Sequence, residues 1–201
     1  MAKANWVVVD PSQGSGNKAV NVSSTSEHTG RNVRSSTLTI TAANVEPVTV
    51  TVNQQGKTEY VQNNSDTVTA NQEGQNVTIR GVSNSKKLTF SLGSGNLNVS
   101  LPSTYTAGGL STNNGVEISG DPGATAEYAW SIVINVPTNE NITELTRQII
   151  VTDDGGNTDI CVITQAAGSP YLRVDTNVVE LSYQGTPVSF NVESNTNWAI
   201  S

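Results

Sequence analysis

Residues 48–54 read Val-Thr-Val-Thr-Val-Asn-Gln, and residues 159–165 read Asp-Ile-Cys-Val-Ile-Thr-Gln. The first stretch alternates apolar and polar side chains, which is the pattern of a β-strand with one buried face. Both stretches close on a glutamine, and these glutamines, Gln54 and Gln165, lie 111 residues apart. Because this spacing also relates residues outside the two strands, it indicates an internal repeat.

The 111-residue spacing pairs apolar residues with apolar residues and turn residues with turn residues. It relates Leu38, Ile40, Val50 and Val52 to Ile149, Val151, Cys161 and Ile163, in that order. It also relates Asp10-Pro11, Gly74, Val77, Ile79 and Ser83-Asn84 to Asp121-Pro122, Gly185, Val188, Phe190 and Ser194-Asn195. Chance alternation would not match Asp-Pro, Gln, Gly and Ser-Asn in one register. The match weakens around 17–33, where we expect a change of loop length.

Short alternating stretches of the same kind recur along the chain, for example at 37–41 and 188–192. Turn residues separate them, including Gly93-Ser94-Gly95-Asn96 and Asp153-Asp154-Gly155-Gly156-Asn157. No stretch has a sustained helical period. Many short strands between turns predict an all-β fold of β-sandwiches.

The repeat divides the chain into one whole module and two partial ones. Residues 57–168 contain a full set of elements, whereas 1–56 match only the second part of that set and 169–201 only the first part. Placing 169–201 before 1–56 therefore assembles a second module. We predict that the two partial segments complete each other, within one chain or between neighbouring chains.

The join between these segments carries a family resemblance. It reads Ser194-Asn195-Thr196-Asn197-Trp198, then Trp6, then Pro11-Ser12-Gln13-Gly14-Ser15-Gly16, followed by strands at 34–40 and 48–56. This order resembles the BACON family of immunoglobulin-like modules, found largely in Bacteroidetes and their phages. The resemblance implies tandem immunoglobulin-like sandwiches, one of them split between the ends of the chain. The central module departs from the family, because Lys87 and Glu117 replace the two tryptophans and about 20 residues (91–111) are inserted.

Half of a sandwich exposes one core face to water, together with unpaired strand N–H and C=O groups. Burial of apolar area at about 25 cal/mol per Å² favours its completion. The expected completion contacts are Trp6, Val7, Val9, Val188, Phe190, Val192, Trp198 and Ile200. Completion within one chain requires the modules to lie side by side and antiparallel, and the short connections near Gly56 and Gly168 make this demanding. Completion between chains would link copies into a ring, chain or mesh, and we favour it.

Charge and hydropathy exclude several partners. The chain has 10 Lys and Arg against 17 Asp and Glu, a net charge of −7. That sign disfavours nucleic acid and anionic membrane surfaces, and no apolar run approaches the roughly 20 residues of a membrane span. The N-terminus has no apolar stretch of about 7–15 residues, so we expect no secretory signal.

Reactive groups are sparse, and we expect no enzymatic activity, no cofactor and no metal. His28 lies in a polar turn, and Cys161 occupies the place of Val50 on an inward strand face, where a thiol is inert. The acidic turn with Asp153, Asp154, Asn157 and Asp159 offers oxygen ligands, so calcium is an alternative there. A twelve-residue calcium loop is missing, however.

The aromatic residues leave two interpretations open. Trp6 and Trp198 are expected to fill the reconstituted core, as large aromatics do in sandwiches; the alternative is a sugar-stacking platform. Tyr105, Tyr128 and Trp130 lie in or near turns of the central module, and we expect them to be exposed contact points.

Three functions fit these expectations. The chain looks like an auxiliary (decoration) capsid protein of crAss-like phages of Bacteroidetes. The resemblance implies a virion protein on the capsid surface, assembled in the host cytoplasm, whose partners are the major capsid protein and copies of itself. The alternative is a carbohydrate-binding module for mucin glycans. The third is a piece of a larger secreted bacterial enzyme or adhesin.

Overall fold

The longest strands of the central segment bury every second side chain, as their sequences predict. In the computed structural model, which describes residues 3–201, β7 (Gln75–Ser83) buries Val77 and Ile79, and β11 (Tyr128–Val136) buries Ile132 and Ile134. The two strands pair antiparallel with Ile79 opposite Ile132. Their apolar side chains therefore form one continuous face.

Two sheets pack face to face and form a β-sandwich. The first sheet has the strand order β10-β9-β11-β7-β5, with β5 (Val61–Asn63), β9 (Thr104–Ala107) and β10 (Leu110–Asn113) beside β7 and β11. The second has the order β6-β13-β12-β8, with β6 (Thr67–Ala70), β8 (Leu88–Gly95), β12 (Leu145–Asp153) and β13 (Thr158–Gln165). All pairs are antiparallel except β6 with β13.

The core between the sheets is closed by aromatic side chains. Phe90 contacts the rings of Tyr105 and Trp130 at centroid distances of 5.0 and 5.4 Å. Trp130 lies over Gly81, where an added Cβ would be 2.3 Å from the indole. The glycine is therefore required by the close approach of the ring. A 3₁₀ turn (Pro122–Ala124) precedes β11.

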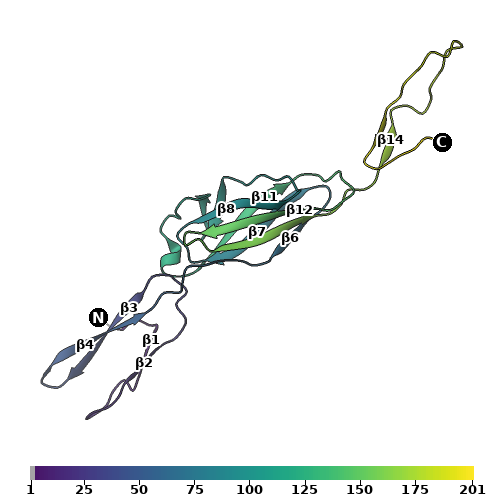
Figure 1. The fold of residues 1–201 in the computed structure, drawn as a ribbon. Helices are drawn as coiled ribbons and strands as arrows, with labels where there is room; N and C mark the ends of the chain where they lie inside the picture. Colours follow the sequence, from purple (N-terminus) through teal and green to yellow (C-terminus); the bar gives the residue numbers. More distant parts are fainter. Residues whose placement is uncertain (1–2) are drawn as a thin grey trace.

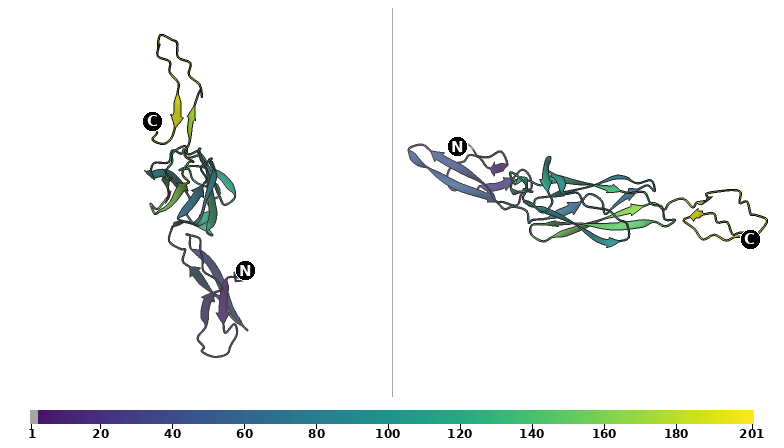
Figure 2. Two further views of the ribbon diagram at one scale, coloured as in Figure 1. Left: turned by 90° about the vertical axis from the view of Figure 1, so that its right-hand side faces the viewer. Right: turned by 90° about the horizontal axis from the view of Figure 1, so that it is seen from above.

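A thin segment of hairpins projects from each end of the sandwich (Figure 1). The N-terminal segment, residues 3–56, has β1 (Val7–Asp10) paired with β2 (Asn21–Ser24) and β3 (Arg34–Ala42) paired with β4 (Val45–Gln54). The C-terminal segment, residues 169–201, has β14 (Leu172–Val174) paired with β15 (Val192–Ser194). Figure 2 shows the two segments at opposite ends from two further directions.

The predicted all-β sandwich fold is confirmed. Both large sheets are built from strands between Val61 and Gln165, inside the predicted central module of 57–168. No helix among residues 3–201 is long and apolar enough to cross a membrane.

Candidate functional site

The N-terminal segment exposes an apolar strand face. In the β3-β4 hairpin, Leu38 lies opposite Val50 and Ile40 opposite Val48. Ile40 is 57% and Val50 44% exposed, whereas the residues 111 positions later, Val151 and Cys161, are each 1% exposed. In the sandwich this face packs against the opposite sheet. In the N-terminal segment nothing among the described residues covers it to the same degree.

The C-terminal segment exposes apolar side chains whose counterparts are buried in the sandwich. Val188 and Phe190 are 52% and 40% exposed, whereas their equivalents Val77 and Ile79 are 4% and 2% exposed. The remaining exposed apolar side chains of this segment are Leu172, Val174, Val178, Val179, Leu181, Tyr183, Trp198 and Ile200. One short segment therefore carries an apolar surface that a folded module would bury.

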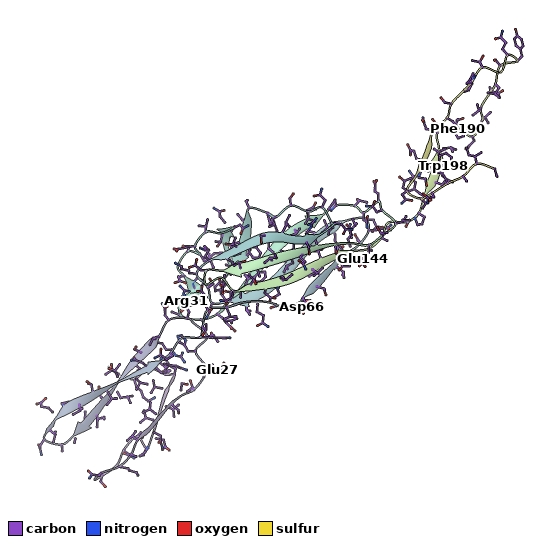
Figure 3. The ribbon with its side chains drawn as sticks, viewed as in Figure 1. Glu27, Arg31, Asp66, Glu144, Phe190 and Trp198 are labelled. Carbon is purple, nitrogen blue, oxygen red and sulfur yellow. The ribbon has the colours of Figure 1, made fainter. Side chains whose placement is uncertain are left out.

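The two segments do not complete each other within one molecule. Phe190 and Trp198 lie beyond one end of the sandwich, and Glu27 and Arg31 lie at the other (Figure 3). The chain termini are correspondingly far apart (Figure 1). In the described part of the chain, residues 3–201, the two segments do not lie side by side, as completion within one chain would require.

Part of the predicted contact set is already covered inside the N-terminal segment. Val7 is buried, Val9 is half-buried, and Trp6 is half-buried under the guanidinium of Arg34, 4.6 Å from the ring centre. This cation–π contact holds the indole against the β3-β4 hairpin. Val192 in β15 is half-buried as well. The most exposed predicted contacts are thus those of the C-terminal segment.

Asn84 fastens the N-terminal segment to the sandwich. Its side-chain Nδ2 donates to the carbonyl oxygens of Thr29 and Thr58 at 3.2 and 3.3 Å, and its Oδ1 accepts from the backbone N–H of Tyr60 at 3.0 Å. The backbone N–H of Lys57 donates to Gly30. We call this region the first joint (residues 28–32, 57–60 and 82–85).

The C-terminal segment is fastened by the same hydrogen bonds one repeat later. Asn195 Nδ2 donates to the carbonyl oxygens of Glu140 and Ser169 at 2.8 and 3.0 Å, and Oδ1 accepts from Tyr171 N–H at 2.9 Å. We call this region the second joint (residues 139–143, 168–171 and 193–196). Each of its residues lies 111 positions after its counterpart in the first joint. The structure therefore repeats the connection between units, as well as the strands.

Charge strengthens the first joint. Arg31 donates to the carboxylate of Asp121 and, at 2.9 Å, to the carbonyl oxygen of Asn84. The hydrogen bond to Asp121 raises the pKa of the guanidinium, which stays charged. The residue 111 positions after Arg31 is Ile142, and the residue 111 positions before Asp121 is Asp10. The second joint therefore has no arginine at the place of Arg31.

The three aromatics that we expected at the surface lie in the core, so that prediction is wrong. Tyr105, Tyr128 and Trp130 are 3%, 6% and 2% exposed. They alternate inward along β9 and β11, and the Tyr128 hydroxyl donates to the Ser85 carbonyl oxygen. Burial raises the pKa of both tyrosines. These side chains are closed to a sugar ring.

The groups with nucleophilic or basic chemistry are held in structural roles. Cys161 is buried in β13, and burial raises the pKa of its thiol to about 11. The thiol is therefore protonated at neutral pH and a poor nucleophile. His28 is buried in the first joint, where Nε2 is 2.7 Å from the carbonyl oxygen of Asn32.

The acidic turn after β12 uses its carboxylates in protein contacts. Asp153 accepts from the backbone and side-chain N–H groups of Asn157, and Asp154 pairs with Lys87 and Lys86. Asp159 accepts from the backbone N–H of Asn63 at 2.6 Å. Within the described part of the chain, no three His, Cys, Asp or Glu side chains gather as metal ligands.

Comparison with known proteins assigns no function to the exposed apolar faces. No family model matches the chain, and no curated protein sequence matches it. A protein from Bacteroides thetaiotaomicron, solved by NMR, is 15% identical, with 52% of this chain and 78% of that one covered and a TM-score of 0.26. An endo-fucoidan hydrolase of glycoside hydrolase family 107 is 12% identical with a TM-score of 0.31, and the match covers 83% of this chain and 22% of the hydrolase. At these TM-scores neither likeness carries an argument about fold or function.

Sequence reasoning placed the exposed strand faces but missed the joints. The signal for them was present, since Ser83-Asn84 and Ser194-Asn195 match in the repeat. Ser83 Oγ donates to the Tyr60 carbonyl oxygen at 2.7 Å, and Ser194 Oγ donates to that of Tyr171 at 2.8 Å. The matched Ser-Asn dipeptide therefore lies at the contact between one unit and the unit before it.

Proposed function

We propose that this protein is a non-enzymatic structural protein whose copies link by completing a split β-sandwich module. The C-terminal segment of one copy supplies the strands that the N-terminal segment of the next copy lacks. The observation that carries the proposal is the pair of exposed apolar faces, because their equivalents are buried against each other in the sandwich. Full burial of one exposed large apolar side chain would contribute about 1.5–3 kcal/mol to the free energy of association.

The repeat also gives the strand pairing. In the sandwich β6 runs parallel to β13, with Val68 opposite Ile163. The equivalent residues are Val179 in the C-terminal segment and Val52 in the N-terminal segment. We therefore expect residues 178–181 of one copy to add as a parallel strand beside residues 51–54 of another.

Self-association at micromolar concentration tests this part of the proposal. Sedimentation velocity over a dilution series should show species larger than the 21.1 kDa chain that dissociate on dilution. Phe190→Asp places a charge on the face that must be buried and should abolish association. Val133→Asp, on the exposed outer face of β11, is the matched control. A monomer at all concentrations would contradict the proposal.

The biological setting that we propose is the surface of a phage capsid, with the major capsid protein as the second partner. The resemblance to BACON-type auxiliary capsid proteins supports this setting, and an elongated unit that links to its own kind suits a surface layer. The test is co-sedimentation of the purified protein with capsids that lack it. Binding to glycan arrays without binding to capsids would favour the carbohydrate-binding alternative, for which the buried Tyr105, Tyr128 and Trp130 offer no contact.

A further inference from the structure

The turn that follows β6 is docked on the end of β11 and the residues after it. We call this turn, residues 71–74, the sandwich turn. The backbone N–H of Asn139 donates to the carbonyl oxygen of Gln72 within it at 2.7 Å. Gly74 approaches so closely that an added Cβ would be 2.6 Å from the carbonyl oxygen of Val136. The docking of the sandwich turn therefore requires glycine at its last position.

The C-terminal segment carries the same turn in the same conformation. We call residues 182–185, which lie 111 positions after the sandwich turn, the donor turn. The backbone N–H of Gly185 donates to the carbonyl oxygen of Ser182 at 2.9 Å, and the equivalent bond from Gly74 is 3.3 Å. Gly185 has a positive φ of 70°, against 81° for Gly74. The donor turn is thus already formed, and Tyr183 within it is 96% exposed.

The surface on which such a turn docks is formed a second time in the N-terminal segment. Residues 25–28, which we call the receiving loop, are the counterparts of 136–139. His28 Nε2 lies 2.7 Å from the carbonyl oxygen of Asn32. The equivalent Asn139 Nδ2 donates to the equivalent carbonyl oxygen at 2.9 Å. The receiving loop is therefore held as its counterpart is held in the sandwich.

The donor turn and the receiving loop do not meet within one molecule. Glu27 belongs to the receiving loop, and Figure 3 shows it on the opposite side of the sandwich from Phe190 and Trp198 of the C-terminal segment. Both parts of the contact are present in one chain, at its two ends. A second copy of the chain is what brings them together.

We propose that the donor turn of one copy docks on the receiving loop of another, as the sandwich turn docks on residues 136–139. The proposal rests on the proposed function, because the donor turn directly follows residues 178–181, the strand expected to add to β4. It adds that the incoming segment reaches past the half-module to the first joint of the accepting copy. The contact therefore ties each incoming segment to the place where the next sandwich begins.

Backbone groups carry this contact, so it does not depend on the side chains that differ between the two turns. The backbone N–H of His28 takes the place of that of Asn139 and donates to the carbonyl oxygen of Tyr183 of the other copy. The close approach is also kept, because the counterpart of Gly74 is again a glycine, Gly185.

Gln54 changes one hydrogen-bond partner when the donor turn docks. In the separate chain its Nε2 donates at 3.2 Å to the exposed Ser24 Oγ. In the sandwich the equivalent Gln165 Nε2 donates at 3.1 Å to the carbonyl oxygen of Asn71, the first residue of the sandwich turn. Docking therefore exchanges the Ser24 hydroxyl for the carbonyl oxygen of Ser182 of the other copy.

Tyr183 brings an aromatic ring to the first joint of the accepting copy. Its counterpart Gln72 lies against the second joint, where Ser169 Oγ donates to Gln72 Oε1 at 3.3 Å. Ser169 is the counterpart of Thr58 in the first joint. Tyr183 therefore lies beside Thr58 of the accepting copy and loses the exposure that it has in the separate chain.

Cross-linking locates the contact. In a Cys161→Val background, the substitutions Thr58→Cys and Tyr183→Cys in one chain should give a ladder of covalent oligomers with a short bis-maleimide. A ladder is expected because each chain carries the two sites at opposite ends, so that every link joins two copies.

Two further pairs calibrate the cross-linking in the same background. Gln72→Cys with Ser169→Cys should link within one chain, because these side chains are in contact in the sandwich. Val133→Cys with Tyr183→Cys measures links formed by random collision, since Val133 lies on the exposed outer face of β11. The ladder should exceed this background.

Gly185→Ala tests the close approach. The added Cβ should meet the backbone of the receiving loop and raise the dissociation constant about tenfold, the effect of one lost hydrogen bond. Gly109→Ala is the matched control, because Gly109 also has a positive φ, 83°, and nothing lies within 4 Å of its added Cβ. It should leave association unchanged. Sedimentation over a dilution series gives the dissociation constants.

These experiments separate the docked turn from the proposed function. Self-association of the Thr58→Cys, Tyr183→Cys chain without a ladder above background overturns the docked turn. A Gly185→Ala chain that associates as tightly as the parent overturns it too, and in both cases the proposed function stands. Absence of association in the parent chain overturns both.

Discussion

Gln54 and Gln165 make the same hydrogen bond one module apart. Gln165 Nε2 donates to the carbonyl oxygens of Pro137 and Asn71 at 2.6 and 3.1 Å. Gln54 Nε2 donates at 3.1 Å to Ser26, the counterpart of Pro137. The counterpart of Asn71 is Ser182, which lies in the C-terminal segment. The environment of Gln54 is therefore half of the one around Gln165, and the other half is at the opposite end of the molecule.

Gln165→Ala should destabilise the sandwich strongly. The side chain is fully buried. Its loss leaves the Pro137 carbonyl oxygen without a donor and leaves that of Asn71 with Gly74 N–H alone, at a cost of roughly 1–3 kcal/mol. Chemical denaturation followed by tryptophan fluorescence measures the change. Gln54→Ala is the matched variant: it should change unfolding of the dilute chain little but weaken self-association. Equal effects of the two substitutions on the dilute chain would contradict the comparison.

A charge placed on equivalent strand positions should separate folding from association. Val50→Glu lies on the exposed face of β4, so the dilute chain should keep its melting temperature and lose self-association. Cys161→Glu puts the same side chain into the closed core, where an unpaired carboxylate is costly, and should unfold the sandwich. Circular dichroism melts and sedimentation velocity distinguish the two results. Loss of folding in Val50→Glu would show that its strand face is already buried in the free chain.

Asn84→Ala should loosen the first joint. Asn84 is fully buried and bonds four backbone groups of two units, so its removal should cost about 2–4 kcal/mol and speed hydrogen exchange of the Tyr60 amide. Asn195→Ala is the counterpart in the half-buried second joint and should speed exchange of Tyr171 with a smaller effect on global stability. Unchanged protection at Tyr60 would contradict the role assigned to Asn84.

Sequence patterns predicted the parts of this fold that depend on local order. Alternation identified β3 and β4, whereas the alternating stretch 188–192 forms a strand only from Val192. The constant spacing matched Gly74 to Gly185, which adopt positive φ values of 81° and 70°. The same patterns predicted which strand faces are apolar. Whether such a face is covered depends on which segments meet in space, and alternation does not contain that information.

The misplaced aromatics show where local pattern fails. Tyr128 and Trp130 follow a turn, which favours an exposed position, but they begin β11 and point inward with Ile132 and Ile134. Trp130 fits only because Gly81 on the neighbouring strand has no side chain. That pairing joins residues far apart in the sequence, and the residues next to Trp130 in the chain do not predict it.

Alkaline pH should weaken the sandwich through Cys161. Burial raises the pKa of its thiol from the ordinary value of 9.0 to about 11 in the folded chain. The folded state therefore holds the proton more tightly than the unfolded state, so this contribution to stability is complete below about pH 9 and is lost as the pH rises towards about 11. Cys161→Val, which copies the residue found at Val50, removes the titrating group. Denaturation midpoints measured from pH 7 to pH 11 should fall less steeply with pH for this variant than for the parent chain. Some fall should remain in the variant, because burial also raises the pKa of Tyr105 and of Tyr128. Identical slopes would show that the thiol does not carry this dependence.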